Sequence, residues 1–111
     1  MNRIAAVAVS LAILTATAAA QNRANDYLLS VGETVRATAL ARAIGEGCVG
    51  VKPFYMGIGK TGINENKAFW SLLCADGRSF SVQVNPDGNG TVLTCGALEA
   101  MGGGPCFRRF D

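Results

Sequence analysis

The spacing of apolar residues changes once along the chain and separates a helical region from a β region. Between Thr34 and Ile44, apolar residues recur at intervals of three to four, which is the spacing of a helix with one buried side. From Phe54 to Ile58, large apolar residues take every second position, which is typical of a strand. The pattern therefore predicts an α+β fold in which a helix precedes a sheet.

The predicted helix has start and stop signals. Ser30 and Glu33 have the S-x-x-E spacing of a capping box, in which both side chains bind free amides of the first helical turn. Residues 21–29 are expected to be a short polar start, and the glycines within 45–47 to end the helix. Arg36 is expected to pack its aliphatic part and extend its guanidinium to water. The expected buried stripe consists of Val35, Ala39, Leu40, Ala43 and Ile44.

Three further strands are expected after the first. Ala68 to Ala75 and Arg78 to Asn85 flank Asp76-Gly77, a pair typical of a tight two-residue hairpin turn. A turn-rich segment then leads to a last strand at Thr91 to Thr94, and Cys95 to Met101 is expected to be a short helix. The predicted architecture is an N-terminal helix packed on a four-stranded antiparallel meander, with a short C-terminal helix.

A two-residue turn also sets the register of the hairpin. It places Leu73 opposite Phe80, so that the odd-numbered residues of the first hairpin strand belong to one mostly apolar face. Trp70 and Leu72, together with Tyr55 of the first strand, then form an apolar patch on the opposite face. If exposed, this patch is a candidate binding surface. The alternative is that the helix covers it.

Residues 1–20 have the pattern of a secretory signal peptide. Arg3 supplies a positive start, Ile4 to Leu14 form an apolar stretch, and Ala18 to Ala20 offer a small-residue cleavage site. The apolar stretch is shorter than the roughly 20 residues of a membrane-spanning helix. We expect 1–20 to be removed and 21–111 to form a single small disulfide-stabilised domain, periplasmic or secreted, with no stable membrane insertion.

Disulfides form in the compartments that exported proteins reach, so the four cysteines are expected to be paired. They allow three pairings. Short loops and the predicted strands favour Cys48 with Cys74 and Cys95 with Cys106. No pair has the C-x-x-C spacing of a redox motif, and the chain has no histidine to complete a zinc site. No metal and no cofactor are expected.

Charge and composition exclude several function classes. The formal net charge is +2, to which Arg3 of the leader contributes one unit, so nothing electrostatic favours nucleic acid as a partner. Without histidine, serine and cysteine nucleophiles lack their usual general base. The acidic residues show no spacing that pairs two of them. The chain is therefore expected not to be an enzyme.

Two motif matches lack the context that their function requires. Gly57 to Gly62 fits G-x-G-x-x-G, and nucleotide binding requires a helix after this motif. No helix is expected there. Asn85 to Gly90 resembles the start of a calcium loop, but Gly96 occupies the twelfth position, where the site needs a bidentate Glu. A glycine-rich strand end and a hairpin turn explain the two segments better.

The C-terminal segment from Phe107 to Phe110 places Arg108 and Arg109 between two aromatic residues. A frayed chain end is the first expectation for such a segment. A docking or anion-binding site that uses both arginines is the alternative.

Three segments of the C-terminal half form a pattern: an aromatic strand at Ala68 to Trp70, a C-A-D-G-R-S hairpin at Cys74 to Ser79, and V-L-T-C at Val92 to Cys95. This combination resembles uncharacterised small exported proteins of alphaproteobacteria. The resemblance implies a periplasmic or secreted location and assigns no catalytic residue.

Together these features predict an exported, non-enzymatic binding module that contacts another envelope or secreted protein through the face around Trp70. The alternative is a small inhibitor of an extracellular hydrolase or protease that presents the loop from Lys60 to Lys67. The candidate binding residues are Trp70, Leu72, Tyr55, Arg108 and Arg109.

Overall fold

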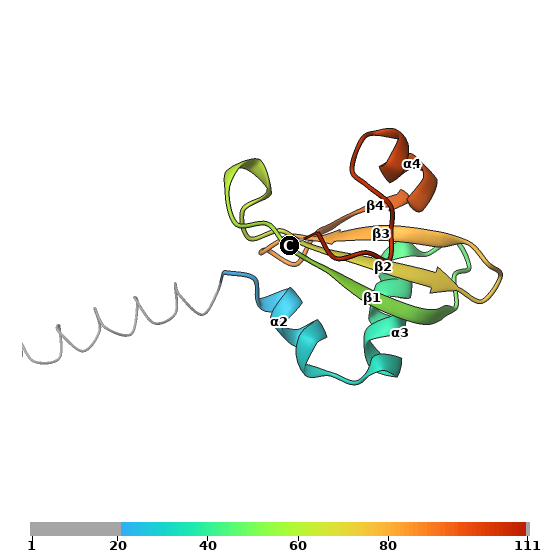
Figure 1. Cartoon of the computed structure of the whole chain (residues 1–111). Helices are drawn as coiled ribbons and strands as arrows, with labels where there is room; N and C mark the ends of the chain where they lie inside the picture. The colour runs from blue at the N-terminus through green and yellow to red at the C-terminus, as the bar shows by residue number, and fades with distance from the viewer. Residues whose placement is uncertain (1–20, 111) are drawn as a thin grey trace, which may run out of the picture.

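The computed structural model describes residues 21–110 and confirms the α+β architecture. The expected leader, residues 1–20, lies outside the described residues. One antiparallel sheet has the strand order β1-β2-β3-β4, as predicted for a meander (Figure 1). The elements are α2 (Arg23–Ser30), α3 (Glu33–Ile44), β1 (Gly50–Ile58), the 3-10 turn η1 (Gly62–Asn64), β2 (Ala68–Cys74), β3 (Ser79–Val84), β4 (Gly90–Thr94) and α4 (Cys95–Ala100).

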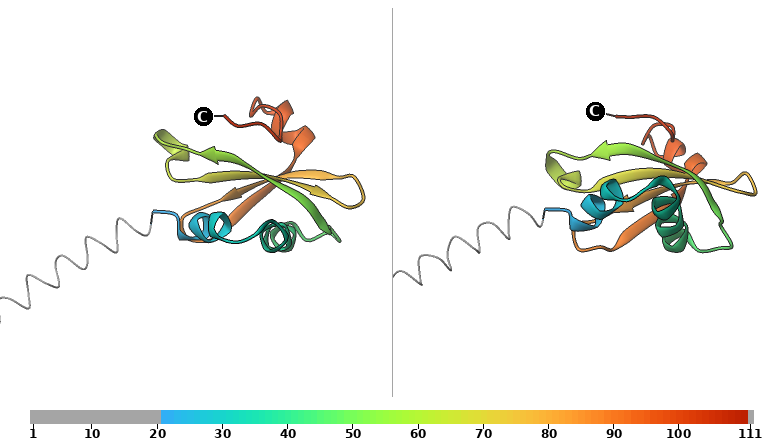
Figure 2. Two further views of the ribbon diagram at one scale, coloured as in Figure 1. Left: turned by 60° about the horizontal axis from the view of Figure 1, so that its bottom comes forward. Right: turned by 90° about the horizontal axis from the view of Figure 1, so that it is seen from below.

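The sheet is covered on both faces. Figure 2 shows α2 and α3 on one face, named here the helix face, and α4 with the C-terminal segment on the opposite face, named the tail face. The main hydrophobic core lies on the helix face. Its largest buried members are Leu28, Leu40, Ile44, Trp70, Leu72, Phe80, Val82 and Val84.

Both predicted disulfides are confirmed. Cys48 is bonded to Cys74, and this bond joins the segment after α3 to the end of β2. Cys95 is bonded to Cys106 and closes the segment that contains α4. Two disulfides are compatible with an extracellular or periplasmic protein.

The turn between β2 and β3 is one residue longer than predicted. The Cys74 amide donates to the Arg78 carbonyl over 2.8 Å, which leaves residues 75–77 as a three-residue turn. Gly77 has φ 94°, the left-handed conformation that such a turn requires at its last position. The Asp76 carboxylate also accepts the Arg78 amide over 3.1 Å. The Asp-Gly pair therefore serves a three-residue turn here.

The longer turn makes the predicted register wrong. Leu72, not Leu73, lies opposite Phe80, and Trp70 lies opposite Val82. Because side chains alternate between faces, a shift of one residue moves the apolar residues of β3 to the face of Trp70. That face lies beneath the helices, so Trp70 and Leu72 of β2 share one core with Phe80, Val82 and Val84 of β3.

Strand β1 departs from the predicted alternation at a β-bulge between Tyr55 and Gly57. Such a bulge adds one residue to a strand and changes which face the following side chains occupy. Phe54 and Met56 lie on the tail face, whereas Ile58 packs against the core on the helix face. The expectation that these three side chains share a face is therefore wrong for Ile58.

Helix α2 is not predicted by the apolar pattern, and the predicted capping box is wrong. The Asn22 side chain caps α2 by accepting the Asn25 amide over 3.0 Å. Ser30 is the last residue of α2, and its hydroxyl donates to a carbonyl of that helix. Gly32 precedes α3 without any side-chain cap. Ser30 is thus engaged in the preceding helix and does not cap the first turn of α3.

The buried side of α3 differs partly from the predicted stripe. Leu40 and Ile44 are buried as expected, together with Ala37. Val35 is 47% exposed, and Ala43 is exposed as well. Alanines lie on several sides of α3, so hydrophobicity alone distinguishes these sides poorly.

Arg36 joins the two helices instead of extending into water. Its guanidinium donates to the carbonyls of Leu28, Leu29 and Val31 over 2.9, 3.2 and 2.9 Å. These acceptors lie at the C-terminal end of α2, where helical carbonyls lack partners within the helix. The guanidinium carbon also lies 5.4 Å from the centroid of the Trp70 ring. Arg36 therefore fixes how α3 meets α2.

A buried asparagine connects α2 to the sheet. Asn25 is 2% exposed; its Oδ1 accepts from Nε1 of Trp70 over 2.7 Å, and its Nδ2 donates to the Tyr55 hydroxyl over 3.3 Å. Asn22 donates to two backbone carbonyls at the same end of the sheet, 2.6 and 3.0 Å away. Among residues 21–110, no buried side-chain nitrogen or oxygen lacks a hydrogen-bond partner.

We expect Asn25→Ala to lower the free energy of unfolding by about 1–3 kcal/mol, because the buried Trp70 indole would lose its acceptor. Urea unfolding followed by the fluorescence of Trp70, the only tryptophan, measures this loss. Thr38→Ala on the exposed side of α3 is the control and is expected to change stability by at most about 0.5 kcal/mol. Equal effects of the two substitutions would contradict the assigned role of Asn25.

Candidate functional site

The predicted patch around Trp70 belongs to the core. Trp70 is 1% exposed and Leu72 is 0% exposed, both beneath α2 and α3. The ring centroid of Tyr55 lies 4.8 Å from that of Trp70, and Tyr55 is partly buried. Of the two alternatives for this face, the covered one is what the structure shows. These three residues are therefore not an exposed contact surface.

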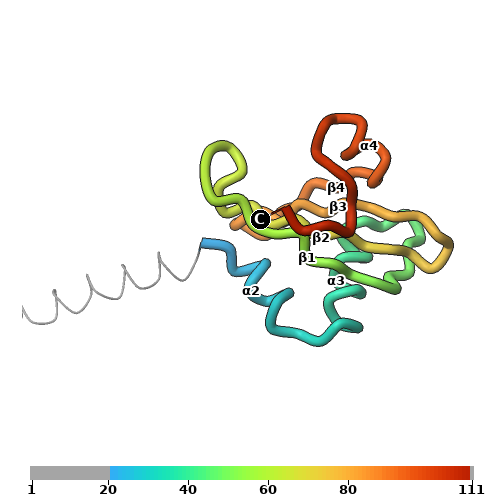
Figure 3. The backbone as a smooth tube through the Cα atoms, viewed as in Figure 1, coloured from blue at the N-terminus to red at the C-terminus, as the bar shows by residue number. Residues whose placement is uncertain are grey.

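The C-terminal segment packs on the tail face, so the expectation of a frayed end is wrong for residues 107–110. Figure 3 shows the segment crossing the sheet. The Phe107 amide donates to Oγ of Ser71 over 2.9 Å, and the Phe110 amide donates to the Met56 carbonyl over 3.1 Å. Each aromatic ring also lies near a phenylalanine of the sheet, with centroids 6.2 and 5.6 Å apart.

Phe107 adopts a backbone conformation that needs support. Its φ is 58°, in the left-handed region, which costs a non-glycine residue on the order of 1 kcal/mol. The disulfide at Cys106 immediately precedes it, and the hydrogen bond to Ser71 holds its amide. The cross-link and the hydrogen bond together place the last residues over the sheet.

The two arginines of this segment have different surroundings. The guanidinium carbon of Arg109 lies 5.3 Å from the ring centroid of Tyr55, beside strand β1. Arg108 is exposed. The use of both arginines to bind an anion stays a prediction.

A hollow of about 480 Å³ lies on the tail face and is named the tail-face hollow. Among residues 21–110, those that line it carry no charge. Met101 and Phe110, two of its apolar lining residues, are 73% and 51% exposed. Other lining residues are Met56, Phe69, Gln83, Leu93 and Leu98. The sequence signal for this hollow is indirect: the Cys95–Cys106 bond closes the segment that contains α4 and brings Cys106, where the C-terminal segment begins, to the end of β4.

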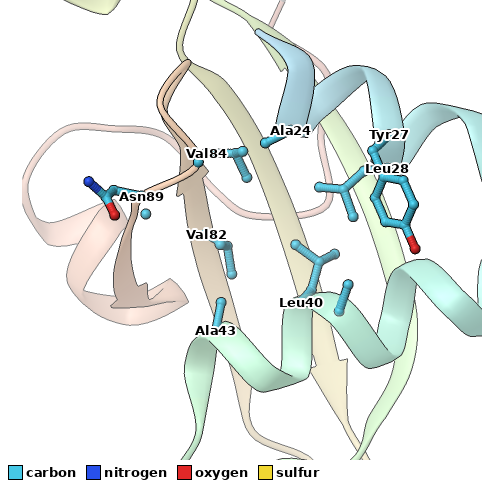
Figure 4. A pocket seen from close by; sticks show the side chains of 11 residues that line it. Ala24, Tyr27, Leu28, Leu40, Ala43, Val82, Val84 and Asn89 are labelled. Atoms are coloured by element: carbon cyan, nitrogen blue, oxygen red, sulfur yellow. The ribbon is translucent and has the colours of Figure 1, made fainter.

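A second hollow, of about 320 Å³, lies on the helix face. Figure 4 shows side chains of α2, α3 and β3 around it, with Asn89 of the β3–β4 turn at one side. Its lining is mainly apolar and includes Leu28, Leu40, Val82 and Val84. Strand β4 borders both hollows, because Gly90 lines this one and Leu93 lines the tail-face hollow.

The glycines of the G-x-G-x-x-G match have structural roles. Gly57 has φ 142°, and a Cβ there would lie 3.0 Å from the Phe110 ring. A Cβ on Gly59 would clash with the Asn64 carbonyl. Gly62 has φ 71° and starts η1. The segment is a strand end and a closed turn, without the long helix that dinucleotide binding requires.

The described titratable groups include no candidate metal-binding cluster. Within residues 21–110, no group of three or more His, Cys, Asp or Glu residues could hold a metal ion. In the same part of the chain, no helix combines the length and the apolar character needed to cross a membrane.

The pKa of Asp76 lies below its usual 3.8, mainly because the Arg78 backbone amide donates to it and also because the Arg78 guanidinium lies 2.8 Å away.

Arg78→Ala should raise the pKa of Asp76 only part of the way to its usual 3.8, because the backbone amide of residue 78 still donates to the carboxylate. A carboxyl whose pKa is lowered by folding stabilises the fold above its unfolded-state pKa, and this stabilisation is lost as the pH falls through the lowered value. Side-chain NMR titration of both proteins measures the change. An identical titration curve for Asp76 in both would contradict a contribution from the guanidinium.

Removing the Cys95–Cys106 bond by the double substitution Cys95→Ala and Cys106→Ala should release the C-terminal segment. The bond spans 11 residues, a loop whose closure contributes about 3 kcal/mol in the chain-entropy description. We expect faster hydrogen exchange at the amides of Phe107 and Phe110, with protection kept in β2 and β3. Unchanged exchange at these two amides would show that the bond does not hold the segment in place.

Comparisons of the chain with protein-family models, with curated proteins and with solved structures each found no match.

Proposed function

We propose that this chain is an exported, non-enzymatic binding module and that its partner is another envelope or secreted protein docking on the tail face. The observation that carries the proposal is the pair of exposed apolar side chains, Met101 and Phe110, at a hollow whose described lining residues carry no charge. Apolar side chains gathered at a surface hollow are typical of protein contacts. The flexible thioether of Met101 suits a contact that must fit a partner closely.

The tail face replaces the surface predicted around Trp70, which is buried. Its elements are ordered without a partner: the Cys95–Cys106 bond closes α4, and the amides of Phe107 and Phe110 donate hydrogen bonds to the Ser71 hydroxyl and the Met56 carbonyl of the sheet. A surface that is already ordered loses less conformational entropy on binding. Order of this kind favours a binding role for the segment.

Export is supported by two features. Residues 1–20 have the pattern of a signal peptide, and all four cysteines are paired in disulfides. The partner is accordingly sought among proteins of the periplasm or the medium.

The inhibitor hypothesis is a second candidate, and it rests on Ile63. This side chain is 84% exposed in η1, within the loop from Lys60 to Lys67. The ends of the loop are joined by hydrogen bonds from the Gly59 amide to Lys67 and from the Asn66 amide to Gly59, each 2.9 Å long. A closed loop with an exposed apolar tip could enter the cleft of a hydrolase.

Affinity capture from periplasmic extract, with Met101→Lys, Ile63→Lys and Val35→Lys beside the unsubstituted protein, tests both candidates. Val35 is the matched control, because it is an exposed apolar residue on the opposite side of the molecule. Met101→Lys should weaken binding of the captured partner at least about tenfold, or about 1.4 kcal/mol. Val35→Lys should have no such effect.

The outcomes separate the two hypotheses. Loss of binding with Ile63→Lys alone, together with inhibition of a hydrolase panel by the unsubstituted protein, would favour the inhibitor. Equal binding by all four folded proteins would contradict docking on the tail face. Thermal unfolding of each variant verifies that it is folded.

A further inference from the structure

Strand β4 is an edge of the sheet with free backbone groups. It pairs with β3 on one side, and within residues 21–110 no strand pairs with its other side. The Asn85 amide donates to the Asn89 carbonyl over 2.8 Å, which fixes the alternation of the ladder. Thr91 and Leu93 therefore bond to β3, while the amide and carbonyl of Val92 point away from it. These outward groups can accept another strand.

The opposite edge strand, β1, has a lysine, a proline and register irregularities, which oppose pairing with another strand. Strand β4 has none of these three features. Strand β1 includes Lys52 and Pro53 and has two register irregularities. The Met56 carbonyl of β1 also accepts a hydrogen bond from the Phe110 amide. Lysine, proline and bulges are the usual protections of edge strands. The sequence of β4, GTVLT, contains no charge and no proline, and its pairing with β3 is regular.

The absence of charged residues around β4 indicates which strand pairs with this edge, a second copy of β4 or a strand of another protein. No charged residue occurs in residues 88–98, which cover β4 and most of α4. Only residues near a two-fold axis lie close to their own copies, so a charge in the middle of β4 would lie near a like charge. A foreign strand would instead gain specificity from opposite charges. The uncharged edge therefore favours self-pairing.

Antiparallel pairing about an axis at Val92 fits the outward groups. The Val92 amide of each copy would donate to the Val92 carbonyl of the other. The Val92 side chain already packs against the core on the helix face, so the pairing would extend that core across the axis. Helix α4 contacts both β3 and β4 on the tail face, where it turns back over the sheet (Figure 2).

We infer that the protein forms a two-fold symmetric dimer in which β4 of one copy pairs antiparallel with β4 of another, making one continuous sheet. The dimer goes beyond the partner proposed for the tail face, and neither depends on the other.

Analytical ultracentrifugation of the disulfide-bonded protein, from about 1 μM to about 1 mM, tests the dimer. We expect a monomer–dimer equilibrium that Thr91→Lys weakens at least about tenfold, because two lysines would lie near the axis on an edge. Thr38→Lys places the same charge on the exposed side of α3 and should leave the equilibrium unchanged. Val92→Pro, which removes the outward amide, is the second disrupting variant.

Hydrogen exchange at the Val92 amide locates the interface. Protection of this amide should rise with protein concentration in the unsubstituted protein and not in Thr91→Lys. A monomer at every concentration would overturn the inference. A dimer that survives both folded β4 variants, or in which the Val92 amide stays unprotected, would overturn it equally, because the contact would then lie elsewhere.

Discussion

The hydrogen bond from the Trp70 indole to Asn25 determines how the rest of the molecule is arranged. Trp70 is almost fully buried, and a buried indole N–H needs an acceptor. Asn25 supplies it from α2, so that short helix must lie against the sheet. Arg36 then binds the carbonyls at the end of α2 and so positions α3. Both helices lie on the helix face, and the C-terminal segment covers part of the tail face (Figure 2).

The sequence predicted most elements, the meander and both disulfides, because these follow from periodicity, turn residues and short loops. It did not predict α2, since the helix contacts the sheet partly through Asn25 and its cap Asn22, and a hydropathy pattern does not register buried amides. The register failed for a different reason. Asp76-Gly77 serves turns of two or three residues, and the one-residue difference in turn length decides whether the apolar side chains of β3 share a face with Trp70.

The candidate site was harder to predict than the fold. Aromatic residues beside arginines near a chain end have no periodicity, so docking of Phe107 and Phe110 has no pattern to indicate it. A partial signal lies in the sheet, where Gly57 and Ser71 place small residues on the tail face at the positions that the segment contacts. These small residues can be interpreted as contact positions only when the Cys95–Cys106 bond is known to place the C-terminal segment over them.

The position of Asn22 also has a consequence for maturation. Its side chain caps α2 and donates to two carbonyls, that of Asn66 in the loop before β2 and that of Val84 at the end of β3. Asn22 lies two residues after the expected end of the leader. Cleavage after Ala20 would leave a charged ammonium group at the adjacent Gln21, which is exposed. Trimming by two further residues would delete the cap and leave carbonyl groups without their donor. If the leader is cleaved as we propose, the native fold therefore requires a cleavage site that leaves Asn22 in the chain.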